Sequence, residues 1–191
     1  MPSTFRIPRA NIDGPYGRLM LAYAKRTWGM VPDTAWVIWH NRKVTNAVLG
    51  FERKVAKWDA LDPHLASFAQ IASAAVIGCS WCTDFGYFMA HDEGLDEAKV
   101  REVPRWRESG VFTAVERDVM EYAEAMSVTP LTVDDDLSHR LQDALGLEAF
   151  VELTQIIALE NMRSRFNSAA GLQAQGFSDV CELPLAVRSN A

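Results

Sequence analysis

The sequence has few cysteines, an excess of acidic over basic residues and no long hydrophobic run. The 19 basic residues face 25 acidic ones and form no basic run, so binding to a phosphate backbone has little support. No window approaches the roughly 18 uninterrupted apolar residues of a membrane span. The N-terminal stretch MPSTFRIPRANIDGPYG lacks the apolar segment of a signal peptide. We therefore expect a soluble, cytoplasmic protein that binds neither nucleic acid nor membrane.

Strand alternation is also missing, and helical periodicity takes its place. With 191 residues and 49% hydrophobic composition, the chain can bury one sizeable core. Leu65, Phe68 and Ala72 fall on one helical stripe. A single helix is expected to open at Pro32 and run through Trp58, and a later helix is expected to be capped by Thr132 or Asp134. The pattern predicts an all-α, single multi-helix domain.

Two of the three cysteines, Cys79 and Cys82, stand three residues apart in AAVIGCSWCTDFGYFMAHDEG. Side chains three apart on a helix have Cβ atoms about 5–6 Å apart, and a disulfide requires roughly 3.5–4.5 Å, so a small adjustment after Gly78 joins them. A helix N-terminus also lowers the pKa of a thiol. In the cytoplasm, close-set cysteines are more often catalytic or metal-binding than structural. The spacing is therefore compatible with redox chemistry.

Other uses of the pair can be weighed from its surroundings. A c-type haem requires histidine directly after the second cysteine, where Thr83 stands. Zinc usually requires a second ligand pair, and His91 and Cys181 are only scattered candidates. A thioredoxin fold places a strand before the motif, where this sequence predicts a helix. Two buried cysteines acting as small apolar residues are the structural alternative. We expect no metal and no organic cofactor.

The helical stretch LDPHLASFAQIASAAVIGCSWCTDFG resembles the core motif of the alkylhydroperoxidase D / carboxymuconolactone decarboxylase superfamily, and IALENMRSRFNSAAGLQAQGFSD resembles its C-terminal segment. The resemblance covers residues 30–180, leaving an N-terminal arm and helix at 1–29 and a tail at 181–191. It implies an all-α domain of the alkylhydroperoxidase D-like type that forms a homo-oligomer, a trimer or hexamer. In redox members, the two cysteines reduce hydroperoxides, and a thiol reductant regenerates them.

The sequence departs from the family pattern at the proton relay. The pattern has a glutamate twelve residues before the first cysteine and a histidine four after the second, and Ser67 and Gly86 stand there. The resemblance still implies a thiol-dependent hydroperoxidase-like oxidoreductase in which Cys82 attacks the peroxide and Cys79 resolves the intermediate. A catalytically diverged helical ligand-binding oligomer, and a lactone decarboxylase-type enzyme, are the alternatives.

Asp84, His40, His64 and His91 are the candidates for a substitute proton carrier. Asp84 stands two residues after Cys82, which on a helix directs it away from that sulfur. His40, His64 and His91 are each interpreted as a cap, a surface group or a satisfied core histidine. Cys181 is interpreted as a thiol that takes no part, as is typical of a lone cysteine in a tail.

Overall fold

The structure, a computed structural model, describes residues 2–186, and that range contains helices and no strand. The α-helices are Gly14–Trp28 (α1), Asp33–Ile38 (α2), Arg42–Val55 (α3), Pro63–Ile77 (α4), Ser80–Asp92 (α5), Glu97–Val100 (α6), Ala114–Ala125 (α7), Asp135–Leu145 (α8) and Leu147–Ala170 (α9). Two short 3-10 helices are Val103–Arg105 (η1) and Phe177–Val180 (η2). None of the helices within residues 2–186 is both long and apolar enough to cross a membrane. The prediction of an all-α domain is confirmed.

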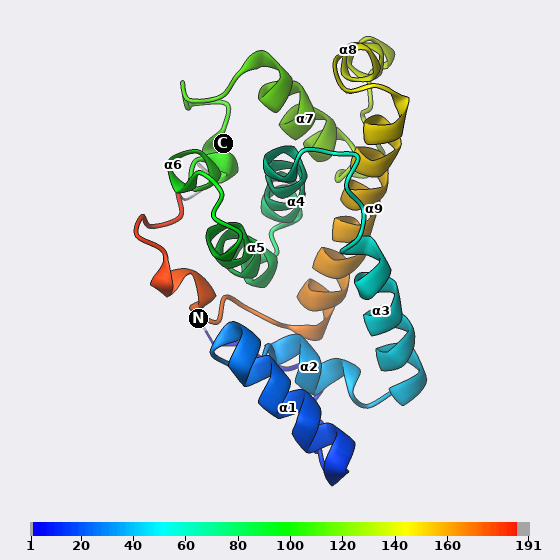
Figure 1. The fold of residues 1–191 in the computed structure, drawn as a ribbon, viewed down its shortest axis with the longest axis vertical. Helices are drawn as coiled ribbons and strands as arrows, with labels where there is room; N and C mark the ends of the chain where they lie inside the picture. Colours follow the sequence, from blue (N-terminus) through cyan, green and yellow to red (C-terminus); the bar gives the residue numbers. More distant parts are fainter. Residues whose placement is uncertain (1, 187–191) are drawn as a thin grey trace.

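Helix α4 is the centre of the fold. Helices α5, α7 and α9 surround it, and the much longer α9 runs along the side of the molecule (Figure 1). Phe68 and Ile71 of α4 are buried in one cluster with Met120 of α7 and Leu153 and Ile157 of α9. A helix surrounded by other helices needs apolar residues on every face, and the sequence PHLASFAQIASAAVI provides them.

The expectation of one continuous helix over residues 32–58 is wrong, because the chain breaks between α2 and α3. Asn41 is the N-cap of α3, and its side chain accepts the backbone N–H groups of Lys43 and Val44. The Thr45 hydroxyl donates to the Asn41 carbonyl and to the last carbonyl of α2. Such side-chain bonds to the backbone compete with a continuous helical ladder, and the apolar periodicity alone does not reveal them.

The turn between α4 and α5 places the cysteine pair. Gly78 has φ 82° and ψ 27°, in the left-handed region that glycine adopts without steric cost, and it ends α4. Cys79 follows as the N-cap of α5. Helix α5 then folds back closely on α4: a Cβ at Gly86 would lie 3.2 Å from Ile71 Cγ1. The departure from the family pattern at Gly86 therefore coincides with a tight contact between the two helices.

The N-terminal arm runs across the C-terminal end of α9. The backbone N–H groups of Thr4 and Arg6 donate to the carbonyls of Gly171 and Ala170, at 2.8 and 2.9 Å. After the arm, α1 and α2 lie beside this same end of α9 (Figure 1). Gly29 ends α1 with a left-handed φ of 74°, at the position where the sequence predicts the stop. The segment before residue 40 thus covers the part of the fold where α5 begins.

Candidate functional site

Cys79 and Cys82 form a disulfide at the N-terminus of α5, with Cα atoms 5.3 Å apart. Cys79 has a non-helical backbone, φ −84° and ψ 89°, which is the local adjustment that the pairing requires. The Cys79 sulfur accepts the backbone N–H of Cys82 at 3.2 Å. In the reduced protein, the same amide and the positive end of the helix favour a thiolate there. The pair is therefore both close enough to cycle and electrostatically supported.

Helix α9 directs a side-chain donor at the second sulfur. Asn167 Nδ2 donates to Cys82 Sγ at 3.4 Å, and Asn167 Oδ1 accepts the Thr34 hydroxyl at 3.0 Å. The bond from Thr34 fixes the amide so that its NH₂ group faces the sulfur. Asn167 is only 3% exposed, so its dipole acts in a low-dielectric environment. Sequence reasoning missed this residue, whose only signal is its place in the family-like segment ENMRSRFN.

Aromatic side chains enclose the disulfide. Trp81 and Phe85 stack with ring centroids 5.0 Å apart, and Phe177 meets both rings edge-on. Cys79 and Cys82 are 2% and 8% exposed. The buried apolar cluster that contains them is completed by Val37, Ala74, Phe88, Ala170 and Leu172. The surroundings are therefore apolar, and they suit a small, weakly polar substrate better than a large charged one.

Asp84 holds the loop that closes the site. Its Oδ2 accepts the backbone N–H groups of Gln175, Gly176 and Phe177 at 2.8, 3.0 and 3.1 Å. Its Oδ1 accepts both the N–H and the hydroxyl of Ser178, at 2.8 and 2.7 Å. These bonds direct the Asp84 carboxylate at the loop of residues 175–178, and they fix Phe177 in the buried cluster that contains both cysteines. No local sequence pattern indicates this anchoring role, because every donor lies about 90 residues further along the chain.

A shallow pocket of about 390 Å³ opens next to this loop. Gln175 separates the pocket from the aromatic cluster, because its Oε1 accepts both the Trp81 indole N–H at 3.0 Å and the Asp33 backbone N–H at 2.7 Å. Arg9 pairs with the Asp33 carboxylate at 3.1 Å. The pocket is lined by Pro2, Ser3, Phe5, Arg9, Asp33, Ala174 and Gln175. The arm and the loop together therefore form the outer wall of the site.

The two positions where the family pattern has its relay lie on two helices that pack together, Ser67 on α4 and Gly86 on α5. Ser67 precedes Ile71 by one helical turn, and Ile71 contacts the space beside Gly86. Neither residue can exchange a proton as a carboxyl or an imidazole does. The chain thus lacks the expected relay at both positions.

A buried carboxyl lies further along α9. Glu160, Ser164 and Asn167 share one face of the helix at spacings of four and three, and all three are buried. The Ser164 hydroxyl donates to Glu160 at 2.6 Å, and Arg163 lies between Glu160 and Glu52. Burial raises the pKa of Glu160 to about 7 although Arg163 opposes the shift. Glu160 can therefore hold or release a proton near neutral pH, about 10 Å along α9 from Asn167.

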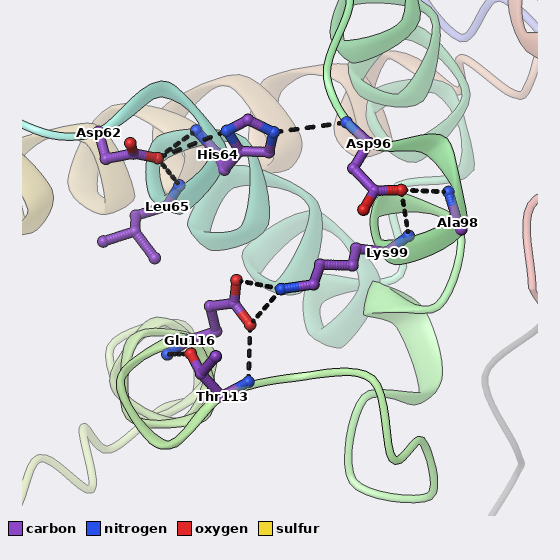
Figure 2. A network of polar contacts seen from close by, with 8 residues as sticks. All are labelled: Asp62, His64, Leu65, Asp96, Ala98, Lys99, Thr113 and Glu116. Carbon is purple, nitrogen blue, oxygen red and sulfur yellow. Dashed lines mark hydrogen bonds and ion pairs between the residues drawn. The ribbon is translucent and has the colours of Figure 1, made fainter.

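The histidines considered as proton carriers make other contacts. His40 donates to the Pro8 carbonyl at 2.8 Å and so holds the N-terminal arm. Figure 2 shows His64 between Asp62 and Asp96: its Nδ1 lies 3.6 Å from the Asp62 carboxylate, and its Nε2 accepts the Asp96 N–H at 3.4 Å. Asp62 and Asp96 are themselves the N-caps of α4 and α6. The interpretation of His64 as part of a capping arrangement agrees with these contacts.

The sequence suggested that His91 and Cys181 are scattered, but the structure brings them together. Together with Glu97 they offer ligand atoms that all lie within 4.8 Å of one another. Their group lies at the far end of α5 from Cys79 and Cys82 and adds no ligand to that pair. Burial, Glu97 and Asp84 raise the pKa of the Cys181 thiol to about 11.

Comparisons with known proteins identify the family. Residues 42–125 match the carboxymuconolactone decarboxylase family. The uncharacterised Escherichia coli K12 protein YnjA is 36% identical over 159 residues, which span 83% of this chain and 81% of YnjA. The chain belongs to the carboxymuconolactone decarboxylase family. The resemblance indicated by the cysteine motif and its flanking helix is thereby confirmed.

Solved structures share the fold of this family member across most of its length. A cysteine-to-alanine variant of the debrominase Bmp8, in complex with 2,3,4-tribromopyrrole, superimposes with a TM-score of 0.80 at 19% identity and covers 93% of this chain and 96% of Bmp8. An uncharacterised peroxidase-related protein from Silicibacter sp. TM1040 gives a TM-score of 0.78 at 14% identity, covering 92% and 96%. At these identities, the likeness is one of fold.

Proposed function

We propose that this member of the carboxymuconolactone decarboxylase family is a thiol-dependent oxidoreductase that reduces small apolar electrophiles, with hydroperoxides as the leading substrate class. The observation that carries the proposal is the Cys79–Cys82 disulfide at a helix N-terminus, with a hydrogen-bond donor directed at each sulfur. A pair of this kind can alternate between dithiol and disulfide without moving the backbone far. Its apolar enclosure favours a small substrate such as an organic peroxide.

The proposed reaction begins at Cys82. Its thiolate attacks the terminal peroxide oxygen, the O–O bond breaks, and the alkoxide takes up a proton and leaves as alcohol, so that Cys82 becomes a sulfenic acid. The Cys79 thiolate then attacks the Cys82 sulfur, the S–S bond forms as the S–O bond breaks, and the leaving hydroxide takes up a proton to become water. A dithiol reductant returns two electrons and two protons by exchange. Asn167 and the amide N–H at the start of α5 stabilise the thiolates, and no metal or organic cofactor takes part.

Proton delivery is where this chain departs from its hydroperoxidase relatives. With Ser67 and Gly86 at the relay positions, we assign the proton-holding role to Glu160, the buried carboxyl on the Asn167 face of α9. Its pKa of about 7, raised by burial, is matched to proton exchange at neutral pH. Because Glu160 lies about two helical turns from Asn167, we expect peroxide turnover to be slower than with a relay in contact with the sulfur.

A second candidate is reductive dehalogenation of a small aromatic ring. It is supported by the likeness in fold to the debrominase Bmp8 over 93% of the chain and by the aromatic rings of Trp81, Phe85 and Phe177, which share the buried cluster of the sulfurs. The balance is the same two-electron exchange: two thiols become a disulfide, the aryl bromide becomes the arene, and bromide and one proton are released. A ligand-binding role, or a lactone decarboxylase-type reaction, would leave both thiols unchanged.

The test compares substrates on one protein. The reduced chain is mixed with cumene hydroperoxide or with a bromopyrrole, and disulfide formation is followed by mass spectrometry together with alcohol or bromide release. We expect one intramolecular disulfide per molecule of product with at least one of the two substrates. Two thiols that stay reduced with both substrates would contradict the proposal and favour the ligand-binding or lactone alternatives.

We further propose that the protein works as a homo-oligomer, a trimer or hexamer, in the cytoplasm, where thiol reductants are available. Tyr16, Leu19 and Tyr23 form an exposed apolar stripe on α1, with exposures of 46%, 65% and 54%. A stripe of this size on one helix face is typical of a surface that another protein chain covers. Light scattering at micromolar concentration tests the oligomer, and a monomer would contradict it.

A further inference from the structure

Three side chains from distant parts of the chain meet at the C-terminal end of α5. His91 comes from the last turn of α5, Glu97 from the start of α6, and Cys181 from the residue after η2. One ligand atom from each lies within 4.8 Å of the other two, and all three residues are half-buried. His91 Nδ1 and Glu97 Oε1 are already in contact. In Figure 1, α6 and η2 each lie next to α5, and the red segment that follows η2 runs up to α6.

The segment that brings Cys181 to this position is held in place by hydrogen bonds. The Tyr87 hydroxyl donates to the Leu183 carbonyl at 2.7 Å, and Glu97 Oε2 accepts the N–H groups of Glu182 and Leu183 at 3.0 and 3.2 Å. Two further hydrogen bonds join Arg101 to the same segment. The Arg101 side chain donates to the Pro184 carbonyl, and the Arg101 carbonyl accepts the Ala186 N–H. The three ligand atoms therefore belong to a preformed arrangement.

The donor set selects a class of metal. An imidazole nitrogen, a thiolate and a carboxylate oxygen suit Zn²⁺, whereas Mg²⁺ and Ca²⁺ prefer oxygen ligands alone. A tetrahedral zinc ion with bonds of about 2.0–2.3 Å holds its ligand atoms about 3.3–3.8 Å apart. Side-chain movements on the order of 1 Å are therefore enough to close the group around an ion. Only the His91–Glu97 contact has to open.

We propose that His91, Glu97 and Cys181 bind one Zn²⁺ ion, with a water molecule in the fourth position. On binding, the Cys181 S–H bond breaks, the sulfur becomes a metal-bound thiolate and one proton goes to solvent. Zinc affinity therefore increases with pH. The titratable and charged groups that act on Cys181 are His91, Glu97 and Asp84, and Arg101 acts on the neighbouring Tyr87.

The proposed ion stabilises structure and leaves the cysteine pair untouched. His91 stands nine residues after Cys82, about 13 Å along the axis of α5, so the ion contacts neither sulfur of the pair. The ion would tie Cys181 to α5 and α6. Cys181 comes only three residues after Ser178, the residue through which Asp84 holds the loop beside the disulfide. Zinc would therefore hold this loop more firmly in place and is independent of the redox proposal.

The experiment uses the full chain with Cys79→Ser and Cys82→Ser, so that Cys181 is its only thiol. After chelator treatment, Zn²⁺ is titrated against a chromophoric chelator, and Co²⁺ is used as a spectroscopic probe. We expect one equivalent of zinc per chain and a thiolate-to-cobalt charge-transfer band. Adding Cys181→Ser is expected to remove the band, and Cys181→Ser or His91→Gln is expected to weaken zinc binding by roughly 100-fold or more.

The matched control is His64→Gln, because His64 is a second histidine beside an aspartate carboxylate, and no cysteine belongs to its network (Figure 2). It is expected to leave the zinc affinity unchanged. Alkylation gives a readout that needs no ligand variant: zinc is expected to slow the reaction of Cys181 with iodoacetamide at least about 10-fold. Unchanged alkylation with zinc, or equal zinc binding with and without Cys181, would overturn the proposal.

Discussion

The two ends of α5 hold sulfur in opposite ways. At the N-terminal end, Cys79 and Cys82 are close because they are three residues apart on one helical turn, and they lie under aromatic rings. At the C-terminal end, Cys181 joins His91 and Glu97 across 84 to 90 residues of chain and is only half-buried. One helix therefore carries a disulfide set by local spacing and a side-chain cluster assembled by tertiary contacts. The cysteine pair can therefore be recognised from its spacing in the sequence, whereas the group of His91, Glu97 and Cys181 cannot.

The largest effect is expected from Cys82→Ser, which destroys the cysteine pair at the N-terminal end of α5. Cys82→Ser is expected to abolish both disulfide formation and substrate turnover, because no attacking thiol is left beside Cys79. The measurement is product formation with a dithiol reductant on variants whose helical content is unchanged. His64→Gln is the control and is expected to keep full activity. A Cys82→Ser protein that still turns over substrate would place the chemistry elsewhere.

The Glu160→Gln variant tests whether Glu160, the buried carboxyl proposed to hold a proton for the cysteine pair, has a raised pKa. Burial raises its pKa from 4.5 to about 7, so the folded protein keeps a proton that the unfolded chain releases. The free energy of unfolding should therefore fall as the pH rises from about 4.5 to 7 and stay lower above it. Glu160→Gln lacks this loss and should gain on the order of 3 kcal/mol over the wild type between pH 5 and pH 8. Urea unfolding at both pH values measures it, and parallel pH profiles of the two proteins would argue against the shifted carboxyl.

Asp84 lies between the two ends, because the loop it holds leads from the aromatic cover to Cys181. Asp84→Asn keeps the size but turns a charged acceptor of five hydrogen bonds into a group that accepts fewer. We expect a loss of roughly 2–3 kcal/mol in the free energy of unfolding. Alkylation of the reduced Cys79 and Cys82 should become faster, because Phe177 is no longer held in the cluster that buries them. Equal alkylation rates in the folded variant would show that the loop does not control access.

Asn167 provides a test of how the Cys82 sulfur at the N-terminal end of α5 is stabilised. Asn167→Ala removes the donor to Cys82 Sγ, and we expect the pKa of the Cys82 thiol to rise and alkylation at pH 7 to slow about 10-fold. Thr34→Val, which only frees the amide to rotate, should have a smaller effect in the same direction. The pH dependence of iodoacetamide reaction measures both. An unchanged profile in Asn167→Ala would mean that the amide does not stabilise the thiolate.

The smallest expected effect concerns the other end of α5. Tyr87→Phe removes the hydroxyl that donates to the Leu183 carbonyl, at a cost of about 1 kcal/mol in the free energy of unfolding. Zinc affinity should fall slightly, while alkylation of the reduced Cys79–Cys82 pair stays as it was. The two readings on one variant show whether the ends of α5 behave independently. A changed rate of alkylation of the reduced Cys79–Cys82 pair in Tyr87→Phe would show that the two ends of α5 are coupled.

The sequence by itself determined what depends on neighbours along the chain. Helical periodicity, the stops at Gly29 and Gly78, the cap at Asp134 and the closeness of Cys79 to Cys82 all follow from helix geometry over a few residues. The break at Asn41 is equally local, but the spacing of apolar residues does not show that the Asn41 side chain accepts the backbone N–H groups of Lys43 and Val44.

Only the tertiary structure decided which groups meet these local features. Asn167 reaches Cys82 across 85 residues, Asp84 accepts donors 91 to 94 residues away, and Glu160 becomes a neutral-pH acid only because other helices exclude water from it. His91, Glu97 and Cys181 form a group for the same reason. Burial and long-range contact arise when helices pack together, and a local pattern of spacing contains no information about which distant residue will complete it.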